Sequence, residues 1–256
     1  MGCIFTGHTR DWIQRNIYYL GAWEPNLSAW IQSTLSLGDA FIDVGANIGY
    51  FSLLAAKAVG TSGHVVAIEP MPTTFAGLAH HVRINSLDNV RLINEAAYGP
   101  GEPQVVTLYL AADHNIGGTS IVPRWDPSES RTARVIARPL ESMLSLEECR
   151  RARIIKIDVE GVEEEAVRGL GLERDVFRPD LELVVEILNE LPRERAHAGQ
   201  VIDYMRVLGF HPYVLQDMHR LRDYVSTAYR TRPVRLTGAL ERSENVVFSR
   251  RNAAVL

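Results

Sequence analysis

The sequence predicts an α/β protein whose core is a doubly wound, mostly parallel sheet with helices on both faces. Short apolar runs alternate with helix-period segments along most of the chain, which is typical of β-α-β units. Residues 181–187 are apolar almost throughout, as in the buried centre of a parallel sheet. The first apolar run passes through two glycines directly into a helical pattern, which indicates a tight turn from a strand into a helix.

Composition restricts the class of protein. The chain has 256 residues, 46% hydrophobic and 23% charged, with a net charge of −4, so no basic field favours nucleic acid or an anionic membrane. The basic clusters at 150–153 and 220–222 alternate with other residues and are interpreted as solvated surface. Cys3 and Cys149 are far apart, so neither a disulfide framework nor a cysteine metal cluster is expected.

The expected location is the cytoplasm, because no apolar run reaches the length of a membrane span and no leader pattern is recognised. We therefore expect no membrane partner and no nucleic acid partner. The sequence does not indicate an oligomeric state.

The N-terminal part is predicted to be a helical cap (1–38) on the main domain (39–256). Residues 12–35 are aromatic-rich and helical in pattern, with interruptions at Gly21 and Pro25. The apolar pattern of the main domain then predicts, in order, strand 39–44, helix 49–59, strand 64–68, helix 73–85 and strand 90–93.

The middle of the chain (103–138) is predicted to be an inset. Residues 104–110 and 133–138 alternate like half-buried strands, which we expect to pair antiparallel. The polar stretch between them is long enough to predict a lid over the substrate. Its candidate substrate-binding residues are His114, Asn115 and Trp125.

Regular alternation resumes after the inset. The pattern predicts strand 153–157, helix 161–170, strand 181–187, helix 198–208, strand 211–215 and a last strand at 245–248.

The glycine turn after the first strand does not fit a phosphate-binding loop. A dinucleotide fingerprint starting at Gly45 needs glycines at 47 and 50, where this chain has Asn47 and Tyr50. A P-loop needs Gly-Lys-Ser/Thr, and Gly49 is followed by Tyr50. An NAD(P)-dependent Rossmann oxidoreductase therefore remains only as an alternative.

Acidic residues at three successive strand ends suggest a different ligand. Asp43 precedes the turn and suits an ammonium group, Glu69 ends the second strand and suits two ribose hydroxyls, and Glu95 after the third strand suits an adenine amino group. Together these groups describe S-adenosylmethionine. The alternative interpretation is that Asp43 and Glu69 only cap helices.

The chain closely resembles the FkbM-type family of S-adenosylmethionine-dependent methyltransferases over residues 19–249. The specific motifs are FIDVGANIG at 41–49, AIEP at 67–70 and IKIDVEG at 155–161, with softer matches at 21–25 and 115–120. The resemblance implies a seven-stranded class I methyltransferase sheet whose last strand is antiparallel to the others. It also implies methylation of a hydroxyl on a small molecule, natural product or glycosyl group. A non-catalytic binding protein on this fold is a further alternative.

Carried over by motif position, the resemblance implies a set of cofactor-binding residues. They are Glu24, Asp43, Gly45, Ala46, Asn47, Gly49, Glu69, Pro70, Glu95, Ala96 and Asp158. Glu24 would close over the cofactor from the cap, or is alternatively a surface acid beside Pro25.

The candidate catalytic residues are three acids at neighbouring strand ends: Asp158, Glu160 and Glu186. A hydroxyl nucleophile benefits from a general base, and any of these carboxylates can accept its proton. Alternatively the three acids hold a divalent cation such as Mg²⁺, or Glu160 only begins the next helix, where acids suit the first turn. His114 and His197 are further candidate bases, and Lys156 is expected to pair with an acid beneath the site.

Overall fold

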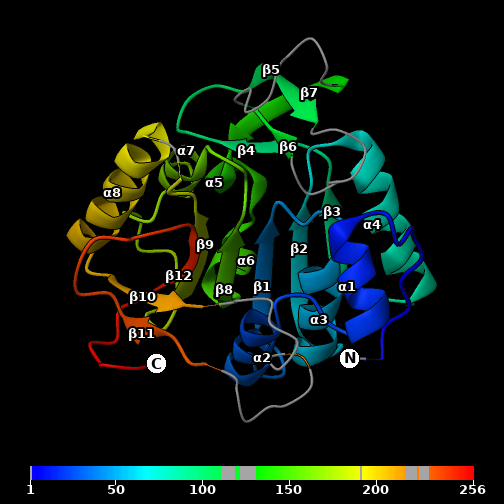
Figure 1. The fold of residues 1–256 in the computed structure, drawn as a ribbon, viewed down its shortest axis with the longest axis horizontal. Helices are drawn as coiled ribbons and strands as arrows, with labels where there is room; N and C mark the ends of the chain where they lie inside the picture. Colours follow the sequence, from blue (N-terminus) through cyan, green and yellow to red (C-terminus); the bar gives the residue numbers. More distant parts are fainter. Residues whose placement is uncertain (1, 111–118, 122–130, 191, 217–223, 225–230) are drawn as a thin grey trace.

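The computed structural model describes residues 2–110, 119–121, 131–190, 192–216, 224 and 231–256. Its main sheet has eight strands in the order β11-β10-β12-β9-β8-β1-β2-β3 (Figure 1). The bounds are β1 Ala40–Val44, β2 His64–Ile68, β3 Val90–Ile93, β8 Ala152–Ile157, β9 Glu182–Ile187, β10 His211–Leu215, β11 Val234–Arg235 and β12 Glu244–Ser249.

Strand directions in the main sheet confirm the expected class I methyltransferase fold. β1 pairs in parallel with β2 and β8, and the parallel run continues to β3 and β9. The last strand, β12, is antiparallel to both of its neighbours, β9 and β10. The structure has one strand more than the seven that were predicted. The additional strand is the edge strand β11, whose two residues are too few to leave a periodic signal in the sequence.

The strand order reverses at β1, because the chain continues from β1 to β2 on one side while β8 lies on the other. Such a switch point opens a crevice at the carboxyl ends of the strands, where α/β proteins bind ligands. The register places Asp43 of β1 beside Lys156 of β8.

Two helices precede the sheet. The first, α1 (Trp12–Leu20), is capped by Asp11, which accepts a hydrogen bond from the backbone N–H of Gln14, and it ends at Gly21 with φ of 75°. The second, α2 (Pro25–Thr34), has proline in its first turn, where no backbone donor is needed. The predicted helical segment and its interruption are therefore confirmed.

Helices cover both faces of the sheet, as expected for a doubly wound fold. On one face, α2, α3 (Tyr50–Val59) and α4 (Pro72–Ile84) pack on alternate strand residues such as Phe41 and Val65. On the other face, α5 (Leu140–Met143), α7 (Glu163–Arg168) and α8 (Pro192–Val207) pack on the intervening residues such as Ile42 and Val66. The strands are therefore buried on both sides, which explains their continuous apolar runs.

A second sheet, in the order β4-β7-β5-β6, lies above the carboxyl edge of the main sheet (Figure 1). Its long strands, β5 (Gln104–Leu110) and β7 (Arg131–Pro139), pair antiparallel, so the predicted pairing of these two segments is confirmed. It also contains two short strands that were not predicted, β4 (Ala96–Tyr98) and β6 (Thr119–Ser120).

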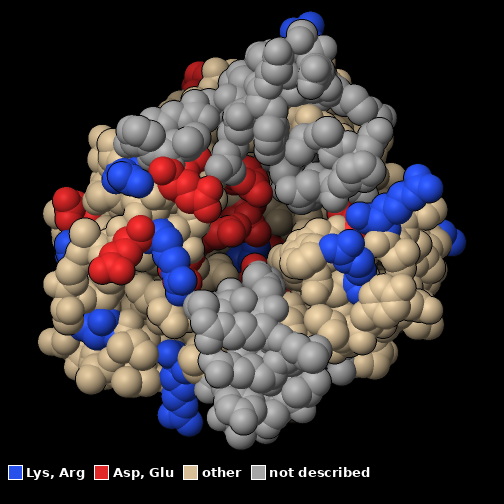
Figure 2. Space-filling view, viewed as in Figure 1, with Lys and Arg blue, Asp and Glu red and all other residues tan. Residues whose placement is uncertain are grey.

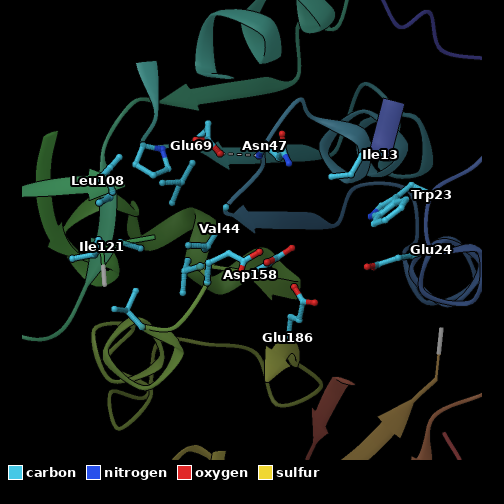
Figure 3. A pocket seen from close by; sticks show the side chains of 18 of the residues that line it. Ile13, Trp23, Glu24, Val44, Asn47, Glu69, Leu108, Ile121, Asp158 and Glu186 are labelled. Carbon is cyan, nitrogen blue, oxygen red and sulfur yellow. Dashed lines mark hydrogen bonds between the residues drawn. The ribbon is translucent and has the colours of Figure 1, made fainter. Parts of the chain in front are cut away.

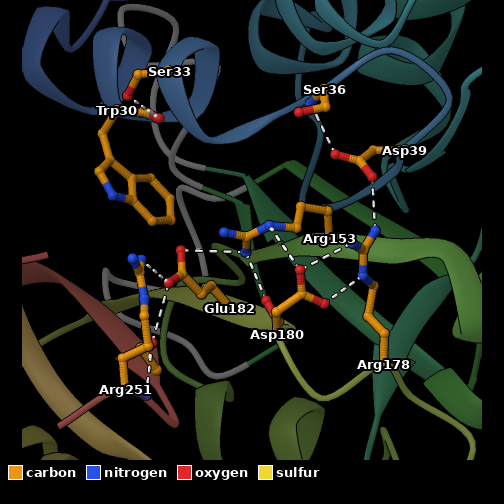
Figure 4. A network of polar contacts seen from close by, with 10 residues as sticks. Trp30, Ser33, Ser36, Asp39, Arg153, Arg178, Asp180, Glu182 and Arg251 are labelled. Atoms are coloured by element: carbon orange, nitrogen blue, oxygen red, sulfur yellow. Dashed lines mark hydrogen bonds and ion pairs between the residues drawn. The ribbon is translucent and has the colours of Figure 1, made fainter.

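The opposite, amino edge of the main sheet is held by ion pairs (Figure 4). Arg178 bridges Asp39 at 2.7 Å and Asp180 at 2.6 Å, and Arg153 contacts Asp180 and Glu182 at 3.6 and 3.4 Å. The side chain of Arg153 is only 13% exposed. The interpretation of residues 150–153 as solvated surface was therefore wrong for Arg153, because its guanidinium joins the starts of β8 and β9.

Two short helices, α5 and α6 (Leu146–Arg151), were not predicted from the sequence. The helix α6 begins with a capping box in which Ser145 and Glu148 satisfy each other's backbone N–H groups. This Ser-x-x-Glu pattern is a recognised start signal. None of the described helices is both long and apolar enough to cross a bilayer.

Candidate active site

A cavity of about 310 Å³ opens at the carboxyl ends of β1, β2, β8 and β9 (Figure 3). Residues from the N-terminal helices and from the second sheet complete its wall. It is lined by Trp12, Ile13, Trp23, Glu24, Val44, Gly45, Asn47, Ile68, Glu69, Pro70, Ala96, Ala97, Leu108, Ile121, Asp158, Val159, Glu160, Val162 and Glu186.

The turn after β1 forms part of the cavity floor. Gly45 has φ of 78°, and a Cβ atom there would lie 1.7 Å from the carbonyl oxygen of Asp158. The backbone N–H groups of Gly45 and Ala46 both donate to the carbonyl of Ile68 at 2.9 Å. Only glycine allows the ends of β1, β2 and β8 to approach this closely.

Strained backbone conformations are concentrated around the cavity. Four described residues other than glycine have positive φ, and three of them, Glu24 (40°), Asn47 (51°) and Glu160 (54°), line it. Such conformations cost of order 1–3 kcal/mol each and cluster at functional sites, where the surrounding structure enforces them.

Glu69 is held in place at the end of β2. Its two carboxyl oxygens accept hydrogen bonds from the backbone N–H groups of Met71 at 2.8 Å and Asn47 at 2.9 Å. Burial raises the pKa of Glu69 to about 7, although the two backbone donors act in the opposite direction. The carboxyl is fixed in orientation and faces the cavity, with lone pairs left for a ligand.

Two further carboxyl groups, Asp158 and Glu186, lie side by side in the cavity (Figure 3) and hydrogen-bond to each other. The charge of Asp158, followed by burial, raises the pKa of Glu186 well above its ordinary value. Burial alone would also raise the pKa of Asp158, but the Lys156 ammonium and the hydrogen bond from Glu186 lower it. The directions of the two shifts favour an ionised Asp158 beside a protonated Glu186.

Beneath the cavity, Lys156 and Asp43 are buried, with exposures of 2% and 1%. Lys156 Nζ donates to Asp158 Oδ2 at 2.8 Å, and Ser52 Oγ donates to Asp43 Oδ2 at 2.6 Å. The prediction that Lys156 pairs with an acid beneath the site is confirmed.

The structure brings most of the predicted site residues together. The predicted residues that line the cavity are Glu24, Gly45, Asn47, Glu69, Pro70, Ala96, Asp158, Glu160 and Glu186. His114, Asn115 and Trp125 lie outside the described residues.

Four predicted cofactor residues are not part of the lining. Asp43 is buried below the lining. The backbone N–H of Ala46 donates a hydrogen bond to the carbonyl of Ile68 in β2, and Gly49 is the N-cap of α3 with φ of 90°. Glu95 is not among the lining residues and pairs with Arg138 Nε at 2.7 Å. His197, the alternative base, also lies elsewhere, in α8.

The sequence did not indicate the apolar part of the lining. Trp12 and Ile13 come from α1 and Leu108 from the second sheet, and their patterns suit ordinary packing. Trp23 could have been identified, because it lies within the motif at 21–25 that also contains Glu24.

The residues present fit S-adenosylmethionine. Asn47 lines the same cavity as Glu69, and its Oδ1 is a buried acceptor without a hydrogen-bond partner among the described residues. An amino or hydroxyl group of a ligand would satisfy it. For a metal ion the fit is poor, because no three His, Cys, Asp or Glu side chains of the described residues are arranged to hold one.

Comparisons with known proteins agree on one family. The family model described as "Methyltransferase FkbM domain" matches residues 43–212. A protein named Methyltransferase 1 from Beauveria bassiana (strain ARSEF 2860) is 29% identical over 149 residues. That match covers 52% of this chain and 59% of the relative, so this chain spans less than two thirds of the relative's length.

Solved structures share the fold at low identity. A candidate rRNA methylase from Clostridium thermocellum has a TM-score of 0.52 at 11% identity, over 87% of this chain and 92% of that chain. An S-adenosylmethionine-dependent O-methyltransferase from Thermotoga maritima has a TM-score of 0.50 at 14% identity, over 93% and 70%. These similarities concern the fold alone.

Proposed function

The chain belongs to the FkbM methyltransferase domain family, and from that premise we propose that it uses S-adenosylmethionine to methylate a hydroxyl group of a small-molecule or glycosyl acceptor. The observation that carries the proposal is the meeting of Glu69, Asn47 and the Asp158–Glu186 pair in one cavity at the switch point of the sheet. These are the groups that a ribose, an amino acid end and a reacting hydroxyl require.

In this proposal the cofactor is held mainly by the first two strand ends. Glu69 accepts hydrogen bonds from the ribose hydroxyls, and the turn Gly45–Asn47 contacts the methionine end. Ala96 lies against the adenine, and Glu24 with Trp23 closes the cavity from the N-terminal cap (1–38). Asp43 is not in the cavity lining, so it contributes through its neighbours: it accepts a hydrogen bond from Ser52 and lies beside Lys156.

The acceptor is proposed to bind where the acidic side chains converge. The cofactor supplies a methyl group on a sulfonium, which is already a good leaving group. The protein therefore has to align the hydroxyl, exclude water and accept one proton. Asp158, Glu160 and Glu186 are the groups in reach. The inset (103–138), with His114, Asn115 and Trp125, is proposed to cover the acceptor.

An anionic acceptor fits this site poorly. Five acids, Glu24, Glu69, Asp158, Glu160 and Glu186, are among the described residues that line the cavity, and none of that lining is Lys, Arg or His. Figure 2 shows the acidic side chains gathered in the central hollow of this face. RNA binding depends on neutralising phosphates with basic side chains. We therefore propose a neutral or cationic acceptor rather than the RNA named for the structural relative.

Calorimetry with S-adenosylhomocysteine tests the cofactor assignment. We expect binding to the wild-type protein, and about 10- to 100-fold weaker binding to Glu69→Gln, because a hydrogen bond to a charged group contributes about 1.5–3 kcal/mol. Glu147→Gln, whose side chain is 78% exposed on α6, is the matched control.

Absence of binding to the wild-type protein would contradict the proposal. Tight binding of NADH instead would favour the oxidoreductase. Binding of S-adenosylhomocysteine with no turnover of any hydroxyl acceptor would favour the non-catalytic alternative.

A further inference from the structure

The buried cation Lys156 is unusual within this chain. The 27 basic residues consist of 25 arginines and only two lysines, Lys57 and Lys156. Lys57 is exposed on α3, whereas Lys156 is 2% exposed at the end of β8. Among the described lysines and arginines, Lys156 is the one that is buried, although the chain uses arginine almost everywhere else.

Acidic groups surround the Lys156 ammonium. Nζ lies 2.8 Å from Asp158 Oδ2, Asp43 is its register neighbour on β1, and the charge of Glu24 acts on it as well. On the α3 side, the ring of Phe51 lies with its centroid 5.0 Å from Nζ. A buried charge is tolerated only with such partners, and here the nearest partner faces the cavity.

The two carboxyl groups of the Asp158–Glu186 pair differ in their surroundings. Asp158 contacts the ammonium, whereas the neighbouring charges that raise the pKa of Glu186 are those of Asp158, Glu24 and Glu160. Two carboxyl groups at hydrogen-bond distance hold one proton between them. The ammonium stabilises a negative charge on Asp158 and thereby leaves the proton on Glu186.

We propose that Lys156 is a positioning residue that keeps Glu186 protonated and Asp158 ionised, so that Asp158 is the base that accepts the acceptor's hydroxyl proton. The proposal rests on the proposed methyltransferase function and selects one of its three candidate bases. In the reaction, an oxygen lone pair forms the new O–C bond and the S–C bond breaks with its electron pair remaining on sulfur. The hydroxyl proton moves to the Asp158 carboxylate and then to water.

The choice of lysine follows from its size. An ammonium is a compact point charge, whereas a guanidinium is a broad planar fork that needs room for several partners. Lys156 Nζ lies between Asp158 and the ring of Phe51, and we expect a guanidinium to disturb these contacts. Lys156→Arg should therefore not restore the function of this position.

Two near-isosteric substitutions locate the base. Glu186→Gln keeps a neutral hydrogen-bond donor beside Asp158 and should lower kcat at least tenfold less than the loss of the Asp158 carboxylate does. Asp158→Asn removes the carboxylate and should lower kcat by about 10²–10⁴-fold, the usual contribution of a general base. The opposite order, or equal losses in both variants, would overturn the proposal.

The pH profile tests the role of Lys156. In Lys156→Met, Asp158 loses its cation, so the pKa of Asp158 rises and the acidic limb of kcat should move to higher pH by about one unit or more. The use of kcat, measured with saturating cofactor and acceptor, keeps Glu69 from setting that limb, because Glu69 also faces Asp158 and has a pKa of about 7. Lys57→Met is the matched control and should leave the profile unchanged.

A second variant moves the profile in the other direction. Asp43→Asn removes an anion from beside Lys156 and Asp158, which lowers the pKa of Asp158, so the acidic limb should move to lower pH. This variant decides the question if Lys156→Met does not fold. Unchanged limbs, or shifts of the opposite sign, would overturn the role of Lys156.

Binding of S-adenosylhomocysteine by each variant separates this inference from the proposed function. If the wild-type protein binds the cofactor product and turns over but the variants do not follow the expected order, only the role of Lys156 fails. If the wild-type protein does not bind it, the proposed function itself fails.

Discussion

Glu69 shows how one buried side chain can make the stability of the fold depend on pH. Its carboxyl is 5% exposed, and burial raises its pKa from 4.5 to about 7. Below about pH 4.5 the group is protonated in the folded and the unfolded chain alike. Between these values the unfolded chain ionises while the folded chain retains the proton, so the stability that Glu69 contributes at acid pH is lost as the pH rises through about 7.

Glu69→Gln should remove this pH dependence. Its free energy of unfolding, relative to that of the wild-type protein, should rise by roughly 3 kcal/mol between pH 4.5 and pH 8, since each pKa unit corresponds to about 1.36 kcal/mol. A constant loss is expected in addition, because an amide cannot accept from both Met71 and Asn47. Urea unfolding at several pH values measures the difference, with Glu147→Gln as the control. Parallel pH curves for all three proteins would contradict the assignment.

For single residues, the sequence indicated which side chains belong near the site more readily than whether each side chain faces the cavity. The acids at strand ends were identified from the sequence, but Asp43 turned out to lie below the cavity and Glu95 outside it. Gly45 was read as part of a ligand cradle, and the structure adds that its missing side chain lets β8 approach. Such contacts join residues more than 100 positions apart, and no local pattern encodes them.

Among the elements, α1 depends on the segment before it. His81 of α4 and Asn85, the C-cap of α4, hold this segment. Asn85 accepts a hydrogen bond from the backbone N–H of Ile4 at 2.7 Å and donates one to its carbonyl at 2.8 Å, and His81 contacts the backbone of Thr6. Because α1 places Trp12 and Ile13 in the cavity wall, this attachment affects the site.

Asn85→Ala should loosen this attachment. Each lost hydrogen bond corresponds to about 1 kcal/mol, so we expect faster amide exchange in residues 2–20 and about 2- to 10-fold weaker binding of S-adenosylhomocysteine. Asn89→Ala is the matched control, because Asn89 also makes two hydrogen bonds to backbone, with Ala56 and Gly60 at the end of α3. Equal losses of affinity in both variants would show that general destabilisation is the cause.

Over the whole molecule, polar interactions are divided between the two edges of the sheet. At the amino edge, arginines pair with acids and tie strand ends together (Figure 4). At the carboxyl edge, five acids are among the described residues that line the cavity. The lysine beneath them, Lys156, is only 2% exposed. A low-dielectric hollow with one sign of charge concentrates ligands of the other sign.

The acceptor preference should follow this charge. In a matched set such as tyramine, tyrosol and 4-hydroxyphenylacetate, which carry a phenol with a cationic, neutral or anionic tail, kcat/KM or competitive binding should be weakest for the anion, by about tenfold or more. Raising the salt concentration should reduce the difference. A preference for the anionic compound would contradict a neutral or cationic acceptor.

The sequence by itself determined the α/β class, the order of the main strands and helices, and the motifs of the family, because these follow from hydrophobic period and short-range turn chemistry. It did not show the short elements α5, α6, β4, β6 and β11, since a few residues carry too little periodic signal. Only the tertiary structure decided which acids face the cavity, that the side chains of Asp158 and Glu186 meet, and that Lys156 pairs with Asp158. Charge and proton position depend on burial and on neighbours from other strands, which exist only once the chain is folded.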